Sequence, residues 1–413
     1  MARKKSVPGE YTYLNAVRQN SVTEAFWPQL GPVVFLTVLF LINFMARIIL
    51  SPLLPTIEKE LGISHGGAGS FFFLISAGYV IALLGSGFLA SRSSHRVTIV
   101  ISSAGVGFAL LGISQTSSLW AMRMGLFCLG FAAGLYIPSA IATITASIAR
   151  PHWGKVIAVH ELAPNLAFFA GPFVAELFLG WSTWRAALSS LGVASLVASI
   201  AYFHFGRGGD FAGVSPASSA FGLLIRSRSF WIIVVLFALG VSSTIGVYAM
   251  LPLYLVSERQ IELSWANTVV ALSRFYGPIL GIVGGWVSDR LGPRQTMVMS
   301  LTFTGTTTLL VGLVATTWIS IVVLLQPLLA VWFFPAAFAA LAATTPAAAR
   351  NLAVAFTIPF GYLIGGGMIP TFIGIMGDTG YFNHGFMVTG TLILLGGLLA
   401  MLLKLPRGRE GIH

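Results

Sequence analysis

The chain has 413 residues, of which 56% are hydrophobic and only 8% are charged. Soluble globular domains carry about 25% charged residues, so this composition excludes a soluble domain and indicates a polytopic membrane protein. The single cysteine, Cys128, excludes an internal disulfide and a thiolate metal site. The formal net charge of +11 would suggest nucleic-acid binding in a soluble protein, but the positions of the basic residues give another account of it.

Twelve apolar segments follow a polar, basic tail, and each is long enough to cross a bilayer as a helix. They lie at about 30–56, 66–90, 97–115, 118–146, 153–180, 184–205, 230–256, 264–287, 296–316, 318–345, 350–376 and 383–403. The longest gap between them is rich in glycine and serine and separates six segments from six. We therefore predict an all-α membrane protein with twelve transmembrane helices in two pseudo-symmetric six-helix bundles.

This division predicts five parts of the chain. In order they are an N-terminal tail at 1–28, a six-helix bundle at 29–205, a linker at 206–229, a second six-helix bundle at 230–404 and a C-terminal tail at 405–413. Because the number of spans is even, both tails and the linker are expected on the same side of the membrane.

Basic residues mark that side of the membrane. Most of the 23 Lys and Arg lie in the tails, the linker and the loops that share their side, whereas only Lys59 and Arg259 lie plainly in opposite loops. Because loops rich in Lys and Arg stay in the cytoplasm, we expect a multi-pass protein of the cell inner membrane with both termini cytoplasmic. This distribution accounts for the net charge without nucleic acid.

A charged turn follows the eighth apolar segment. It reads Gly285-x-x-x-Asp289-Arg290-x-Gly292-x-Arg294, and the same frame recurs half a chain earlier as Gly87-x-x-x-Ser91-Arg92-x-Ser94-x-Arg96. Each copy follows an apolar helix and resembles the loop motif of the major facilitator superfamily, which joins helices 2 and 3 and again helices 8 and 9. The resemblance covers roughly residues 30–404 and implies a secondary transporter whose two halves rock against each other.

The resemblance also implies gating roles for the charged residues of the two turns. These residues are Asp289, Arg290, Arg294, Arg92 and Arg96. The first copy departs from the motif, because Ser91 replaces the aspartate and Ser94 replaces a glycine. Ser91 has no charge to contribute, so we expect the second turn to matter more for gating.

The first apolar segment contains Asn43 and Arg47. The run from Asn43 to Ser64 is similar to the first helix of organic-anion transporters of the anion:cation symporter family, in which an arginine at this place meets the anionic group of the substrate. Ala46 stands where members of that family often have an acid, which weakens the case for proton coupling through this helix. The alternative is that Arg47 extends its side chain to the outer interface. We expect Arg47 and Asn43 to contact substrate.

Arg274 lies within an otherwise uncharged span, roughly 20 Å of helix from its cytoplasmic end. Monocarboxylate carriers of the same superfamily are similar in placing a substrate-binding arginine in helix 8, although Val270 and Ala271 stand where those carriers have an aspartate. A structural ion pair is the alternative, but Glu161 and Glu176 are the only acids within the spans. We therefore expect Arg274 to bind substrate.

The fifth apolar segment contains His160, Glu161 and Pro164. Proline has no N–H, so the carbonyl of His160 loses its helical donor, and a carbonyl, an imidazole and a carboxyl group cluster within one turn. Such a carboxyl could hold and release a proton as its surroundings change. We expect Glu161, assisted by His160, to carry a coupled proton. The alternative is that Glu161 pairs with a basic residue near the inner gate.

Tyrosines within the spans could donate a hydroxyl to a carboxylate. They are Tyr79, Tyr136, Tyr248, Tyr276 and Tyr362. We take Tyr79, Tyr136 and Tyr276 as candidate substrate contacts, with simple packing as the alternative. The cluster of proline and glycine between Pro359 and Pro370 predicts a bend or hinge in the eleventh span.

The sequence contains no phosphate-binding loop, no metal-ligand cluster and no set of nucleophile and base. We therefore expect no enzyme and no cofactor. The predicted function is secondary active transport of a small organic anion, expected to be a carboxylate, with proton symport to drive it against a negative-inside potential. Two alternatives stay open: an efflux antiporter of amphipathic compounds, suggested by the apolar content and by Gly171-Pro172, and a non-transporting membrane sensor. The expected partners of this monomer are the anion, protons and the lipid bilayer.

Overall fold

The computed structural model describes residues 30–149, 152–213, 224, 226–346 and 349–405. The predicted N-terminal tail, residues 214–223 and 225 of the predicted linker, and the C-terminal residues from 406 onward lie outside the described residues. Twelve helices in the described part are long and apolar enough to cross a membrane, and no described residue lies in a strand. The prediction of an all-α protein with twelve spans is therefore confirmed.

Several spans consist of two helices joined by a break. The first six spans comprise α2 (Leu30–Ile48), α3 (Leu50–Leu61), α4 (His65–Arg92), α5 (His95–Gln115), α6 (Leu119–Gly134), α7 (Tyr136–Ser147), α8 (Trp153–His160), α9 (Leu162–Trp181) and α10 (Trp184–Phe205). The last six comprise α12 (Arg228–Val241), η4 (Ser242–Gly246), α13 (Val247–Ser257), α14 (Leu263–Ser273), α15 (Gly277–Leu291), α16 (Pro293–Leu313), α17 (Thr316–Leu325), η5 (Ala330–Trp332), α18 (Phe333–Thr344), α19 (Arg350–Gly361), η7 (Tyr362–Met368), α20 (Ile369–Asp378) and α21 (Phe382–Met401).

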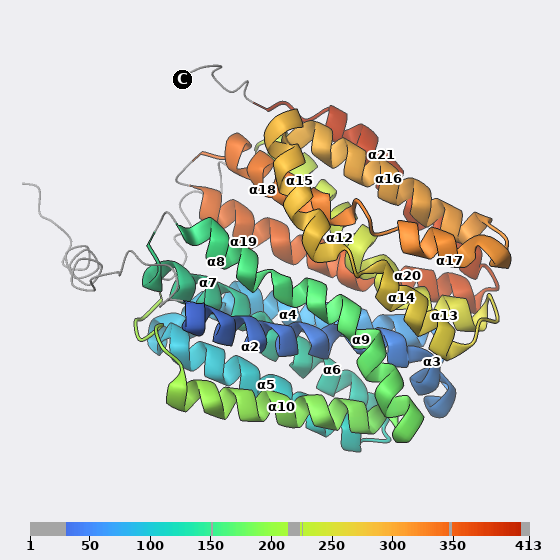
Figure 1. Ribbon diagram of the computed structural model, residues 1–413, viewed down its shortest axis with the longest axis horizontal. Helices are drawn as coiled ribbons and strands as arrows, with labels where there is room; N and C mark the ends of the chain where they lie inside the picture. The colour runs from blue at the N-terminus through green and yellow to red at the C-terminus, as the bar shows by residue number, and fades with distance from the viewer. Residues whose placement is uncertain (1–29, 150–151, 214–223, 225, 347–348, 406–413) are drawn as a thin grey trace, which may run out of the picture.

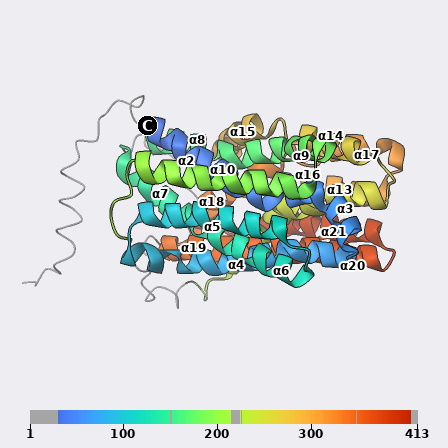
Figure 2. The same ribbon diagram turned by 90° about the horizontal axis from the view of Figure 1, so that it is seen from below.

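The two sets of six spans form two bundles that lie side by side. Figure 1 shows the first bundle in blue and green and the second in yellow to red, with the helices of both running lengthwise. In Figure 1 the start of α2 lies on the left, and α21 ends toward the same side, at the upper edge of the molecule beside the start of α16. At the opposite end, α3, α13 and α20 lie close together in Figures 1 and 2.

Small residues bring neighbouring helices into close contact within the first bundle. A Cβ atom added at Gly78 of α4 would collide with the carbonyl oxygen of Phe127, and one added at Gly130 of α6 would collide with that of Ile75. Lipid offers no hydrophobic driving force for helix association, so close van der Waals packing takes its place. The glycine-rich composition therefore serves the packing of α4 against α6.

Two spans of the second bundle contain π-helical segments, η4 and η7. Such segments leave backbone carbonyls outside the regular helical ladder. In η4, the carbonyl of Ser243 accepts from Gln326 Nε2 at 2.8 Å, and that of Thr244 accepts from Arg274 Nη2 at 3.1 Å. The stretch predicted as a hinge coincides with η7 and its three consecutive glycines. Two backbone carbonyls of η4 are thus paired inside the protein, as membrane proteins require of irregular backbone.

Candidate functional site

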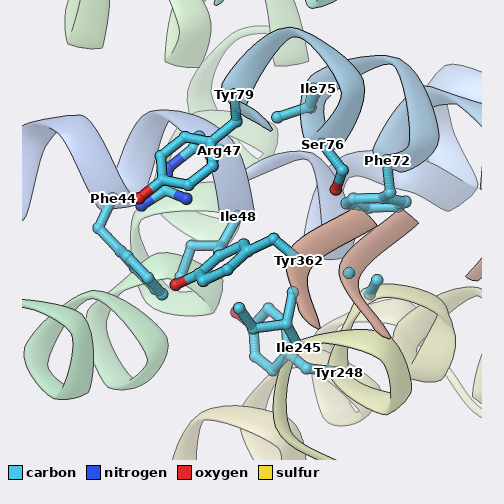
Figure 3. A pocket seen from close by; sticks show the side chains of 12 residues that line it. Phe44, Arg47, Ile48, Phe72, Ile75, Ser76, Tyr79, Ile245, Tyr248 and Tyr362 are labelled. Atoms are coloured by element: carbon cyan, nitrogen blue, oxygen red, sulfur yellow. The ribbon is translucent and has the colours of Figure 1, made fainter. Parts of the chain in front are cut away.

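A small cavity of about 30 Å³ lies between the two bundles. Figure 3 shows its lining, to which α2 and α4 contribute from the first bundle and η4, α13 and η7 from the second. The lining residues are Phe44, Arg47, Ile48, Phe72, Ile75, Ser76, Tyr79, Ile245, Tyr248, Ala249, Tyr362 and Gly366. A ligand in this pocket would touch both bundles, which is what a carrier that couples binding to rocking needs.

Arg47 is the one cation in this lining. It lies in the last turn of α2, and only 7% of its surface is exposed. Its guanidinium carbon lies 4.5 Å from the ring centre of Tyr79, 4.7 Å from that of Phe44 and 5.7 Å from that of Tyr362. Figure 3 shows the guanidinium between these aromatic side chains. Arg47 is therefore packed inside the protein and does not extend to a membrane interface.

The Arg47 guanidinium has donors that nothing in the described chain accepts from. Its Nε and Nη2 atoms are buried without a hydrogen-bond partner, and no carboxylate of a described residue lies within 4.0 Å of it. Cation–π contacts with desolvated rings are worth up to about 2 kcal/mol each, which offsets only part of the cost of burying a charge. A cation in this position attracts an anion.

Arg274 lies at a break in the eighth span, which we expected to be continuous. The span ends as α14 at Ser273 and resumes as α15 at Gly277. Pro278 explains the break, because it has no N–H to offer the carbonyl of Arg274, which accepts instead from Gly277 N at 3.1 Å. The break places the guanidinium at the carbonyl of Thr244 and leaves Nε buried without a partner.

The two arginines share an aromatic wall. The guanidinium carbon of Arg274 lies 4.8 Å from the ring centre of Phe168 and 5.2 Å from that of Tyr248. Tyr248 lines the pocket of Arg47, and Phe168 packs edge-on against Phe44 at 5.2 Å. Arg274 itself is 6% exposed and does not line the pocket. In this conformation Arg47 faces the pocket directly, and Arg274 lies behind Tyr248 and Phe168.

The other predicted substrate contacts divide into two groups. Tyr79 lines the pocket beside Arg47. Tyr136 lies elsewhere, with its hydroxyl donating to the carbonyl of Leu36 at 2.5 Å. Tyr276 is 52% exposed outside the lining, and Asn43 donates to the carbonyl of Ala133 at 3.3 Å. The structure thus brings Tyr79 to the pocket and places Tyr136, Tyr276 and Asn43 outside it.

Several lining residues were absent from our sequence-based site. Phe44 precedes Arg47 by three residues, and Ser76 precedes Tyr79 by three, so each pair shares one face of its helix. That spacing is a signal that could have identified Phe44 and Ser76. Ile245 and Gly366 come from π-helical segments, where the rotation of side chains departs from the α-helical pattern, and no sequence signal indicates that they face Arg47.

The predicted proton-coupling pair lies at the break between α8 and α9. His160 is fully buried, and its ring stacks on Phe40 at 4.5 Å with Nε2 3.4 Å from the hydroxyl of Tyr136. The Glu161 side chain is 53% exposed, and its Oε1 lies 3.6 Å from His160 Nδ1. The carboxyl group is thus half-exposed and next to a buried imidazole that has no hydrogen-bond partner on Nδ1 in the described structure.

The two charged turns differ in their partners. In the second turn Asp289, Arg290 and Arg294 are exposed, and among the described residues Asp289 has no basic group within 4.0 Å. In the first turn Arg96 pairs with Asp210 of the linker at 3.2 Å, and the Arg92 guanidinium lies 3.9 Å from the ring centre of Phe88. The first turn has Ser91 in place of the motif's aspartate, and Asp210 of the linker supplies a carboxylate to this turn instead. We did not expect this role for Asp210 from the sequence.

Comparison with known proteins identifies the sequence family and the fold. The family model described as "Major Facilitator Superfamily" matches residues 36–325 and 260–412. The "Probable L-galactonate transporter" of Escherichia coli K12 is 22% identical over 274 residues, which cover 60% of this chain and 59% of that protein. The "Probable sulfoacetate transporter SauU" of Cupriavidus necator is 23% identical over 277 residues, which cover 62% and 64%. The chain spans about three fifths of the length of these curated relatives.

Solved structures show the same fold at low sequence identity. A bacterial homolog of the human lysosomal transporter Spinster, in an inward-facing and occupied conformation, is 14% identical with a TM-score of 0.73, over 90% of this chain and 96% of that one. A POT family transporter in complex with 5-aminolevulinic acid is 13% identical with a TM-score of 0.75, over 92% and 97%. The predicted resemblance in fold is confirmed.

Proposed function

The chain belongs to the major facilitator superfamily, and on that premise we propose that it is a secondary active transporter of a small organic anion, a carboxylate, that works by alternating access. The observation that carries this proposal is Arg47, a buried guanidinium in a pocket between the bundles, with two donor atoms free and no described carboxylate beside it. A charge buried within a membrane protein marks a substrate or ion site by default.

The chemistry of the pocket fits one anionic group attached to a small body. A guanidinium offers parallel N–H donors that match a carboxylate. The hydroxyls of Tyr79, Tyr362 and Ser76 belong to the lining and could take further polar groups of the ligand. The names of the relatives, with L-galactonate and sulfoacetate, support an organic anion.

Arg274 supplies the link to conformational change in this proposal. Arg47 belongs to the first bundle and Arg274 to the second, and both are buried cations. An anion that reaches both would reduce their mutual repulsion and favour a state in which the bundles have closed around it. A ligand shifts a conformational equilibrium only through such differential contacts.

We further propose that both termini are cytoplasmic and that a proton drives uptake of the anion. The distribution of basic residues supports cytoplasmic termini in the cell inner membrane. A negative-inside potential opposes anion entry by about 2.3 kcal/mol per charge per 100 mV, so uptake needs a driving ion, for which we propose a proton. Glu161 beside His160 is the candidate group, because its carboxyl group is half-exposed at the break between α8 and α9 and lies 3.6 Å from His160 Nδ1.

We expect Glu161→Gln to separate exchange from accumulation. The neutral amide resembles a protonated carboxyl, so the carrier should still exchange anion across the membrane, but it should lose accumulation driven by an imposed pH gradient. His160→Ala should retain more of the coupling, since the imidazole only orients the carboxyl group. Counterflow and pH-driven uptake in the same proteoliposomes measure both quantities. Normal pH-driven accumulation in Glu161→Gln would show that the proton travels elsewhere.

An efflux antiporter of amphipathic compounds is the second candidate, because much of the pocket lining is apolar. The apolar side chains of Phe72, Ile75 and Ile245 could contact an apolar ligand that forms no hydrogen bond with the protein. The two candidates differ in their need for the guanidinium: an apolar substrate would tolerate its loss, and a carboxylate would not.

A thermal-shift screen tests the proposed substrate class directly. Detergent-purified protein is mixed with carboxylates, sulfonates, phosphates and uncharged sugars, and the unfolding temperature is recorded. Ligand that binds only the folded state at about 100 times its Kd stabilises it by about 2.7 kcal/mol, which is measurable as a raised Tm. We expect small carboxylates to raise the Tm and matched uncharged sugars to leave it unchanged. Stabilisation by amphipathic cations instead would favour the antiporter.

A further inference from the structure

The start of α4 and the end of α20 meet across the boundary between the two bundles. Gly66 N of the first bundle donates to Asp378 Oδ2 of the second at 3.0 Å. Thr371 Oγ1 of the second bundle donates to the carbonyl oxygen of Gly367 in its own span at 2.9 Å and also lies 3.3 Å from that of Gly69 in the first. The Gly66–Asp378 hydrogen bond must break, and the Thr371–Gly69 contact must part, if the bundles separate at this end of the molecule.

Glycines make this contact too close for side chains. A Cβ atom added at Gly66 would lie 2.7 Å from Asp378 Oδ2, and one added at Gly69 would lie 2.5 Å from the carbonyl oxygen of Pro370. On the other helix, a Cβ atom at Gly374 would collide with the carbonyl oxygen of His65. The two helices therefore touch backbone to backbone, and even a methyl group would force them apart.

Asp378 stabilises the N-terminus of α4, whereas its negative charge is unfavourable at the C-terminus of its own helix, α20. The first turn of α4 has N–H groups without helical acceptors, and Ser64 Oγ satisfies only one of them, that of Gly67 at 3.1 Å. A carboxylate at a helix N-terminus is favoured by the helix dipole, whereas Asp378 is the last residue of α20, where that dipole opposes a negative charge. The favourable partner of this carboxylate thus lies in the other bundle.

A second set of hydrogen bonds joins the bundles at the same end. Asn267 Nδ2 of α14 donates to Glu176 Oε1 at 2.5 Å and to the carbonyl oxygen of Pro52 at 3.3 Å. Ser51 Oγ donates to the carbonyl oxygen of Tyr248 at 2.7 Å. Figures 1 and 2 show α3, α13 and α20 together at the end opposite the start of α2.

We propose that Asp378 and the N-terminus of α4 form a gate that holds the carrier closed at the end opposite the chain termini. Breaking the Gly66–Asp378 hydrogen bond and parting the glycine contact would open the pocket toward that side. The gate rests on the alternating access of the proposed function, but it needs neither the anion nor the proton to be correctly identified. Its carboxylate belongs to neither charged turn and lies in the half of α20 remote from them.

The gate is tested by cysteine accessibility without any substrate. The background variant is Cys128→Ser, and Ser76→Cys places a single reporter in the pocket lining. Right-side-out and inside-out vesicles, with sidedness checked by a C-terminal tag, are treated with a membrane-impermeant maleimide. The quantity measured is the labelling rate from the face opposite the termini divided by the rate from the terminal face.

Asp378→Ala is expected to raise this ratio by about three- to tenfold, and Asp378→Asn less, because the amide oxygen can still accept from Gly66 N. Gly69→Ala should raise it as well, since the added methyl group meets the backbone of α20. Thr379→Ala is the matched control, because this exposed neighbour donates only to Met376 of its own helix. The control should leave the ratio unchanged.

An unchanged ratio in both Asp378→Ala and Gly69→Ala, with both proteins monodisperse in detergent, would overturn the gate. This outcome would leave the anion proposal standing, because no anion enters the assay. Conversely, a raised ratio together with a negative thermal-shift screen would support the gate and overturn the proposed substrate class.

Discussion

Replacing Arg47 with alanine is expected to abolish binding and transport of the anion while the protein still folds. Removing one partner of a buried, hydrogen-bonded charge pair costs about 2–5 kcal/mol, and every 1.4 kcal/mol is a factor of ten in affinity. We therefore expect a loss of at least about 30-fold in affinity. Folding should survive, because Arg47 forms no ion pair with any described residue and its contacts are with aromatic rings.

Arg47→Lys should recover little of the activity. An ammonium is a point charge that cannot bind a carboxylate through two parallel donors or lie flat against the ring of Tyr79. The matched control is Arg123→Ala, since Arg123 also faces an aromatic ring, that of Trp120 at 5.7 Å, but does not line the pocket. Uptake by proteoliposomes and the ligand-induced change in Tm are the measurements. Full uptake by Arg47→Ala with unaltered affinity would refute the anion site and favour an uncharged or apolar substrate.

Replacing Arg274 with alanine is expected to abolish transport as well, through a different step. Arg274 lies behind Tyr248 and Phe168, so an anion must draw the guanidinium away from the carbonyl of Thr244 to reach it. The exchange of a neutral carbonyl for a carboxylate adds the attraction between opposite charges to the hydrogen bond. We expect Arg274→Ala to lower the rate of transport more than it lowers the affinity for the anion at Arg47.

Arg274→Gln separates this role from a structural one. Glutamine could still donate an N–H to the carbonyl of Thr244 and so keep η4 in place, but it carries no charge. If Arg274 only holds η4, Arg274→Gln should transport at a rate near that of the parent. If Arg274 binds the anion, it should be as inactive as Arg274→Ala. Single-turnover exchange and equilibrium binding in the same preparations distinguish the two results.

A large part of the architecture followed from the sequence because hydropathy is a local property. The bilayer requires about 20 apolar residues in each span, so composition alone located the twelve spans and their division into two bundles. The same rule identified Arg47 and Arg274, because an arginine within such a span is conspicuous wherever the helix packs. The two charged turns half a chain apart indicated the family, which the family model confirmed.

The surroundings of those arginines were decided only by tertiary structure. Which residues face Arg47 depends on how α2 is rotated against α4 and on the π-helical segments η4 and η7, and no local pattern sets these angles. For that reason Tyr79 reached the pocket and Tyr136 did not. The break at Arg274 follows from Pro278, but the acceptor that the guanidinium meets there, the carbonyl of Thr244, lies 30 residues away in the chain and is brought to it by packing.

The contact between Asp378 and Gly66 is the clearest case of a feature that the sequence alone does not predict. In sequence Asp378 is an acid at the end of a helix, where it would be taken for a solvated residue, and Gly66 is one of 46 glycines. The two are 312 positions apart, and the hydrogen bond between them exists only because the two bundles pack against each other. Sequence determined the spans and the buried charges, since both depend on local transfer into lipid. Tertiary structure alone determined what those charges face and where the bundles touch, since both depend on packing between distant helices.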